Sequence, residues 1–185
     1  MKKMLILSMI LMVFALGAYQ ANAQDKLTKK QRKEAKMLKA VEDKKALLEA
    51  VNDRTWVLEA NTVYDRYGNP FFTTPSTNFI MINGDQSVIQ LAFPFYFGYN
   101  GLGGITFDDR VSSYEVKEGN KPNSGINVNI QVSGVNIGNA SVSISSTPDG
   151  KARATVYGPW GWRVTYQGNL VPLEESNVFE GQPLF

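Results

Sequence analysis

The sequence predicts a mainly β protein, in which an antiparallel meander of about eight strands closes as a barrel or a sandwich behind one amphipathic helix. Two observations support this prediction. Residues 25–53 contain neither glycine nor proline and are rich in strong helix formers. From Thr55 onward, apolar residues alternate with polar ones, which is typical of strands with one buried face and one face in water.

Residues 1–23 have the pattern of a signal peptide. Lys2 and Lys3 precede an apolar run over residues 4–18, and the small-residue pattern at 21–23 predicts cleavage between Ala23 and Gln24. The apolar run falls short of the roughly 20 residues that a membrane-spanning helix needs. We therefore expect an exported protein of the periplasm or cell surface, with no transmembrane segment in the mature chain.

Composition narrows the possible chemistry. The sequence has no His and no Cys, which excludes imidazole bases, thiol nucleophiles, disulfides and zinc sites built from these ligands. Without Lys2 and Lys3, the remaining basic residues balance the 17 Asp and Glu, and a neutral chain is a poor candidate for nucleic-acid binding. Glycine-rich cofactor motifs are also missing from the sequence. We expect no enzyme, no cofactor and no metal.

The segment from residue 24 to residue 53 predicts the helix. Its apolar residues recur at helical spacings and form one stripe, made by Met37, Leu38, Val41, Leu48 and Val51. The N-terminal half carries an excess of basic side chains. Two interpretations follow, in which the stripe docks on the following domain or the helix lies on an anionic surface.

Residues 54–170 predict the β domain, and residues 171–185 a poorly ordered tail. Asn83-Gly84-Asp85 and Asp149-Gly150 are typical of tight turns between antiparallel strands. The expected strands cover 56–63, 78–83, 87–93, 104–107, 111–116, 126–132, 140–144, 152–156 and 162–167.

Two aromatic loop segments provide the candidate binding residues. Residues 93–104 combine five aromatic residues with four glycines, and residues 157–162 place two Trp near a hairpin connection. Exposed rings at these places could stack on sugars or anchor a protein partner, or they could instead fill the end of the β core. The candidate contact residues are Tyr96, Tyr99, Tyr157, Trp160 and Trp162.

The carboxylates do not form a recognisable catalytic pair. Asp108 and Asp109 follow the expected strand 104–107, and adjacent residues of an extended chain point their side chains to opposite faces. A glycosidase needs two carboxylates that face each other across a cleft. We therefore assign no catalytic residue.

Four segments together resemble a known family. They are Trp56–Asn61, the aromatic element Phe93–Gly98, the run Gly103–Phe107 and the closing Arg163–Gly168. In this order they are similar to the domain of unknown function 4251 family, exported proteins of the Bacteroides group. Phe93 stands where the family usually has Leu, and an additional aromatic residue precedes Gly98. The resemblance implies a compartment and a fold, but no activity.

Two functions remain open at this point. The first is a non-catalytic β-type binding module of the envelope, for a small apolar ligand or a glycan. The second is a structural or assembly factor of the envelope that docks on another protein through its N-terminal helix. In either case the partner is an unidentified small ligand or envelope protein.

Overall fold

The structure, a computed structural model, describes residues 29–92, 99–119, 124–135 and 138–183. The chain forms two compact units, one ending at Lys39 and the other running from Ala40 to Phe185. The predicted signal peptide, with its cleavage site between Ala23 and Gln24, lies outside the described residues. Tyr96, one of the candidate contact residues, also lies outside them.

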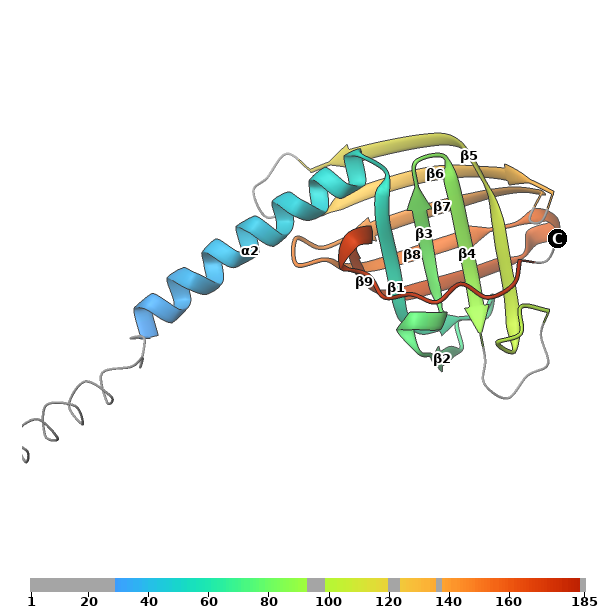
Figure 1. Cartoon of the computed structure of the whole chain (residues 1–185), viewed down its shortest axis with the longest axis horizontal. Helices are drawn as coiled ribbons and strands as arrows, with labels where there is room; N and C mark the ends of the chain where they lie inside the picture. Colours follow the sequence, from blue (N-terminus) through green and yellow to red (C-terminus); the bar gives the residue numbers. More distant parts are fainter. Residues whose placement is uncertain (1–28, 93–98, 120–123, 136–137, 184–185) are drawn as a thin grey trace, which may run out of the picture. The chain divides into compact units, whose positions relative to one another are not determined.

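Over the described residues, one long helix precedes nine strands of a single antiparallel sheet (Figure 1). The helix α2 covers Lys29–Asn52. The strands are β1 (Thr55–Tyr64), β2 (Pro70–Phe72), β3 (Phe79–Asn83), β4 (Gln86–Ala92), β5 (Gly104–Glu118), β6 (Ile126–Gly134), β7 (Gly138–Ser146), β8 (Lys151–Tyr157) and β9 (Arg163–Pro172). Three short 3-10 helices connect them, η1 (Pro75–Thr77), η2 (Pro159–Gly161) and η3 (Leu173–Glu175).

The sheet closes as a barrel. Each strand from β3 to β9 pairs with its sequence neighbour, and β9 pairs with β1 to complete the ring. The first half of β1 pairs with β3 and its end with β2, so that β2 is an addition outside the eight-stranded ring formed by the described strands. This confirms the predicted mainly antiparallel β fold and identifies the barrel as its form of closure.

The alternating pattern of β6, β7 and β8 places one set of side chains inside the barrel. In β6, for example, Ile126, Val128, Ile130 and Val132 are buried while the residues between them are more exposed. Together with Trp56, Leu58 and Tyr166 they belong to one contiguous apolar core. Burial raises the pKa of Tyr166, whose hydroxyl donates to the backbone oxygen of Gln90.

Two features of the strands differ from the prediction. Residues 104–118 form one continuous strand rather than two short ones, because Asp108, Asp109 and Arg110 keep pairing with β4 through the polar interruption. The short strand β2 was not predicted, since Pro70 begins it and its three residues are all exposed.

The helical stripe divides into a buried and an exposed part. Leu47, Ala50 and Val51 are buried in the barrel core, and Leu48 packs against that core. Met37, Leu38 and Val41 are instead largely exposed. The docking interpretation of the stripe therefore holds for its last turns and not for its earlier residues.

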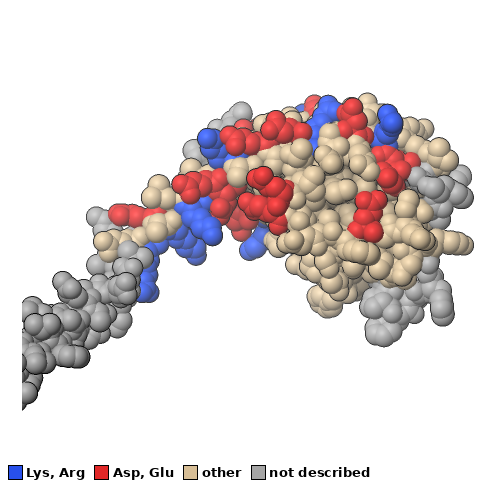
Figure 2. Space-filling model, in the orientation of Figure 1, with Lys and Arg blue, Asp and Glu red and all other residues tan. Residues whose placement is uncertain are grey.

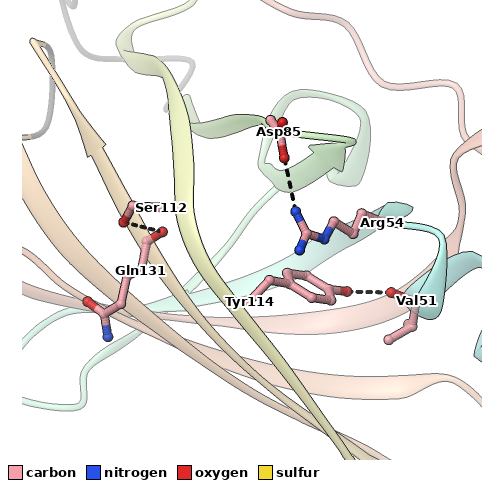
Figure 3. A network of polar contacts seen from close by, with 6 residues as sticks. All are labelled: Val51, Arg54, Asp85, Ser112, Tyr114 and Gln131. Atoms are coloured by element: carbon pink, nitrogen blue, oxygen red, sulfur yellow. Dashed lines mark hydrogen bonds and ion pairs between the residues drawn. The ribbon is translucent and has the colours of Figure 1, made fainter.

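A compact polar network joins the end of α2 to the barrel (Figure 3). The Tyr114 hydroxyl donates to the Val51 carbonyl at 2.6 Å and accepts from Trp56 Nε1 at 2.8 Å. Arg54, which has the left-handed φ of 57° that ends the helix, lies over the Tyr114 ring and pairs with Asp85 at 2.9 Å. Burial raises the pKa of Tyr114, although the Trp56 hydrogen bond and the Arg54 charge oppose that shift.

The C-terminal segment differs from the expected poorly ordered tail. Strand β9 continues to Pro172, and residues 173–182 follow the outside of β3 and β4 with regular contacts. Val178 and Leu173 pack on a small apolar cluster formed by Val57, Phe79 and Val88. Two apolar residues of the tail are enough to hold it against the barrel, because this part of the sheet has an apolar outer face.

Gln90 holds this segment in place. Its amide nitrogen donates to the carbonyls of Thr77 and Phe179, both at 2.9 Å, and its amide oxygen accepts from the Gly181 amide at 2.7 Å and the Thr106 hydroxyl at 2.8 Å. All four hydrogen bonds that the side chain can make are therefore present.

Charged side chains gather over α2 and β5 in the view of Figure 2, whereas the area over β3 and β4 carries few of them. Among the described helices, none combines the length and the apolar character that crossing a membrane would require.

Candidate functional site

The predicted aromatic contact residues do not form one cluster. Tyr99 is 80% exposed, and Tyr157 lies half-exposed at the end of β8. Trp162 is partly buried, edge-on to Phe107 with ring centroids 6.1 Å apart, and packs against the barrel core. Trp160 lies in η2, and its side chain, like all of Tyr96, lies outside the described residues. Trp162 is thus placed where it fills the core.

The outer surface of β6 and β7 is uncharged and polar. Its outward residues are Asn, Gln and Ser, and they hydrogen-bond in cross-strand pairs. Ser145 donates to Asn127 at 2.7 Å, and Ser143 donates to Asn129 at 3.0 Å. The register of β7, β8 and β9 continues these rows into Arg153 and Gln167. We call the outward side chains of β6 to β9, with the end of β1, the polar face.

Tyr64 organises the part of the polar face where β1 meets β9. The Arg153 guanidinium carbon lies 4.7 Å from the centre of the Tyr64 ring, in a cation–π arrangement. The Tyr64 hydroxyl donates to Gln167 Oε1 at 3.1 Å. Arg153 and Gln167 are also direct cross-strand partners in β8 and β9. We call Tyr64, Arg153 and Gln167 the Arg153 cluster.

A surface hollow of about 430 Å³ adjoins the Arg153 cluster. Arg153 and Gln167 both line it, together with Asn61, Ser145 and Asn169. The exposed Asn61 continues the outward positions Val57 and Glu59 of β1, at the point where the pairing of β1 with β9 shifts between Ala60 and Thr62. Most of the residues that line the hollow thus carry an amide, a hydroxyl or a charged group, although much of the exposed surface comes from their apolar atoms.

A second basic and aromatic group lies farther along the same edge. Arg163 donates to the backbone oxygen of Arg66 at 2.5 Å, and the Arg66 guanidinium lies over the Tyr67 ring. We call Arg66, Tyr67 and Arg163 the Arg163 group. On β9, Arg163 and Gln167 are four residues apart, so about 13 Å separates the two positions.

Asp65 is the acidic residue within this turn. Its carboxylate accepts hydrogen bonds from the Tyr67 and Asn69 amides and from the Asn69 side chain, at 2.8–2.9 Å. The Asn69 side chain contributes most to lowering the pKa of Asp65, and the backbone amides add to this. The role of Asp65 is therefore to fix the turn between β1 and β2.

A second hollow, of about 500 Å³, contains the carboxylates that sequence reasoning considered. Asp85, Asp108 and Asp109 line it with Gln86 and Arg110. Asp108 accepts from the Gln86 amide at 3.0 Å, and Asp109 is buried. In the part of the chain that the structure covers, no three acidic residues are grouped so as to hold a metal ion.

The arrangement is that of a closed antiparallel β-barrel whose core receives the last turns of a helix and whose outer surface carries a polar face. The family model for the domain of unknown function DUF4251 matches residues 29–170, and the chain belongs to this family.

A solved structure of a DUF4251 family protein from Bacteroides eggerthii DSM 20697 is similar to the chain. The two sequences are 31% identical, the TM-score is 0.61, and the match covers 75% of this chain and 93% of the other. None of the curated proteins matches the chain. These comparisons confirm the resemblance inferred from the four sequence segments.

Sequence reasoning missed Tyr64, Arg153 and Gln167. It predicted the strand to which Arg153 belongs, but the alternation that turns a residue outward does not distinguish a contact residue from ordinary surface. The cation–π contact joins β1 to β8 across 89 positions of sequence and depends on closure of the barrel. A possible signal was the absence of acidic residues from the outward positions of β6 to β9.

Proposed function

We propose that this protein is a non-catalytic glycan-binding module, exported to the cell envelope, and that the polar face is its binding surface. The observation that carries the proposal is the Arg153 cluster. Tyr64 fixes a guanidinium over its ring and an amide at its hydroxyl, both beside an open hollow. Polar groups held in place before binding lose little entropy when a ligand arrives.

The chemistry of the polar face suits a sugar chain. Sugar hydroxyls both donate and accept hydrogen bonds, as do the amide and hydroxyl side chains of this surface. The rows formed by Asn127 with Ser145 and by Asn129 with Ser143 lead across β6 and β7 towards the Arg153 cluster. An extended oligosaccharide can follow such a row, whereas a compact apolar ligand gains little from it.

The barrel interior supports a small apolar ligand less well. Val128, Ala154 and Val156 are completely buried, and Ile130, Val142 and Ile144 nearly so. Side chains with so little exposure leave no space the size of a water molecule beside them. The ligand class that we propose is therefore the glycan rather than the apolar molecule.

Binding of a panel of defined oligosaccharides, followed by calorimetry, tests the proposal. We expect Gln167→Ala to weaken binding about tenfold or more, because a hydrogen-bonding group in the hollow is lost. Tyr99→Ala is the matched comparison, since Tyr99 belongs to a loop that sequence reasoning favoured. Loss of binding in Tyr99→Ala alone would move the site to that loop, and absence of binding to any oligosaccharide would refute the glycan function.

Exposed residues on α2 support a second candidate function, docking on an envelope protein. Met37, Leu38 and Val41 have exposed fractions of 61–68%, although they are apolar. In this alternative, replacing all three with Ser should release the protein from its partner in the envelope while the barrel stays folded. Unchanged association of the triple variant with the envelope fraction would contradict it.

A further inference from the structure

The side chains of the Arg153 cluster offer donors to a ligand rather than acceptors. Tyr64 donates its hydroxyl proton to Gln167 Oε1, which uses one of the two lone pairs of that oxygen and turns the amide nitrogen of Gln167 away from Tyr64. The Arg153 guanidinium carbon lies over the Tyr64 ring, and among the described residues no hydrogen bond or ion pair engages its N–H groups. A ligand group that accepts hydrogen bonds therefore suits this cluster.

The charged residues along this edge of the sheet also favour an anionic ligand. Within the described residues, Arg66, Arg153 and Arg163 have no carboxylate partner: Arg153 contacts the Tyr64 ring, Arg66 contacts Tyr67, and Arg163 binds a backbone oxygen. Asp65 precedes Arg66 in the sequence, and its oxygens are engaged by the amides of its own turn. Lys151, which also lines the hollow, already pairs with Asp149 at 3.5 Å.

Tyrosine rings position two of these guanidinium groups. The guanidinium groups of Arg153 and Arg66 lie over the rings of Tyr64 and Tyr67, and Arg66 also donates a hydrogen bond to the Tyr67 hydroxyl. A guanidinium held in this way matches a planar carboxylate with two parallel hydrogen bonds, which a lysine cannot do. Carboxylate is also one of the anionic groups that sugar chains carry, as in uronic acids.

We propose that the ligand of the polar face is an acidic glycan, a chain containing uronic acids, and that Arg153 and Gln167 bind one of its carboxylates. The Arg163 group, about 13 Å along β9, binds a second carboxylate of the same chain. This inference rests on the proposed glycan-binding function and names the class of its ligand.

Calorimetry with paired oligosaccharides tests the inference. The probes are oligogalacturonate, oligomannuronate and unsulfated oligoglucuronate-containing chains, each compared with its neutral methyl ester. We expect the acid form of at least one pair to bind at least tenfold more tightly than its ester, and its binding to weaken as salt is raised. Inorganic sulfate and sulfated oligosaccharides serve as probes for anion binding in general.

Variants of one residue type separate the possible outcomes. Arg153→Gln should lower affinity for the acid form at least tenfold and remove the preference over the ester. Arg153→Lys, which keeps the charge, should recover only part of it. Arg110→Gln removes an exposed arginine of β5 outside the polar face and should leave binding unchanged.

The results also distinguish this inference from the proposed function. If acid and ester bind equally and Arg153→Gln binds both as the wild type does, the acidic class is wrong while the glycan function stands. Stronger binding of sulfated chains than of uronates overturns the carboxylate assignment. If no member of the panel binds in either form, both the inference and the proposed function fail.

Discussion

At the scale of single residues, Tyr114 shows how one hydroxyl can couple three parts of the chain. It lies on β5, donates to the last turn of α2 and accepts from Trp56 at the start of β1. Both partner atoms belong to buried residues, so neither can turn to water when the hydroxyl is removed. An unpaired buried polar group costs more free energy than a hydrogen bond contributes when it is present.

We therefore expect Tyr114→Phe to lower the free energy of unfolding by about 2 kcal/mol, since the Trp56 indole loses its partner and the Val51 carbonyl keeps only the longer hydrogen bond from the Arg54 amide, at 3.3 Å. Urea-induced unfolding followed by Trp fluorescence measures this change. Tyr99→Phe removes a hydroxyl from an exposed ring and is the control, expected to unfold as the wild type does. Equal stability of both variants would show that the network does not hold the helix.

Glu180 lies in the C-terminal segment, and the protonation of its carboxyl group affects the stability of the folded protein. Partial burial, and then the charge of Asp108, raise the pKa of Glu180 above its ordinary value of 4.5. Because folding favours the neutral carboxyl, the folded state is destabilised as the pH rises through the raised pKa, and this penalty is absent below the ordinary pKa.

Glu180→Gln should therefore stabilise the protein at pH 7, where the wild-type carboxyl is charged, and have little effect below pH 4.5. Unfolding curves of both proteins at several pH values check the prediction. Glu174→Gln, at an exposed position of η3, is the comparison variant. A stabilisation independent of pH would show that the charge of Glu180 is not its cause.

At the scale of elements, α2 combines two kinds of surface along one helix. Its last turns bury Leu47, Ala50 and Val51 in the barrel core, whereas Leu38 remains 66% exposed. Apolar periodicity in the sequence revealed the stripe, but it could not show where the barrel ceases to cover it. That limit depends on where the barrel ends, which no local pattern encodes.

Replacing leucine with alanine at two positions of α2 compares the contribution of its buried and exposed parts to stability. Leu47→Ala should destabilise the protein by about 3 kcal/mol, because it leaves a cavity in the core. Leu38→Ala should change stability by less than about 0.5 kcal/mol, because the side chain is already in water. Thermal and urea unfolding of the two variants provide the comparison, and similar losses at both positions would contradict the assigned burial.

The strands show what sequence patterns can and cannot predict. Strands β6, β7 and β8 follow from strict alternation, and the structure agrees with them within two residues at each end. Strand β5 was divided in two because its polar residues Asp108 to Arg110 interrupt the pattern without interrupting the pairing. The tail was misjudged because its few apolar residues gain their partners from β1, β3 and β4 only after folding.

At the scale of the whole molecule, closure of the barrel depends on a close approach between β9 and β1. A Cβ atom added at Gly168 would lie 1.8 Å from the carbonyl oxygen of Glu59. Gly168 follows the buried Tyr166, and both belong to the closing segment that carried the family resemblance. Sterics thus require a glycine at position 168, because any side chain would push β1 and β9 apart.

Gly168→Ala should therefore destabilise the protein by about 3 kcal/mol or more, or prevent the barrel from closing. Circular dichroism and urea unfolding detect either result. Asn169→Ala, at the next and exposed position of β9, tests whether the strand itself tolerates substitution. A stable Gly168→Ala variant would mean that β1 and β9 can separate locally without loss of the fold.

The polar face could be predicted only in outline. Alternation predicts the polar outward residues of β6 to β8, and the lack of acids among them was a signal that the sequence analysis did not use. The Arg153 cluster could not be predicted, because Tyr64 belongs to the first strand, Arg153 to the eighth and Gln167 to the ninth. Only the ring closure of β1 with β9 brings these side chains together.

The pairing of β1 with β9 also has a consequence for how the chain acquires its structure. Strand β1 can pair with β9 only after most of the chain has been synthesised. Contacts between residues so distant in sequence slow folding, because a large loop must close before any of them forms. A nascent chain that lacks β9 should expose the edge of β1 and remain sensitive to proteases until synthesis is complete.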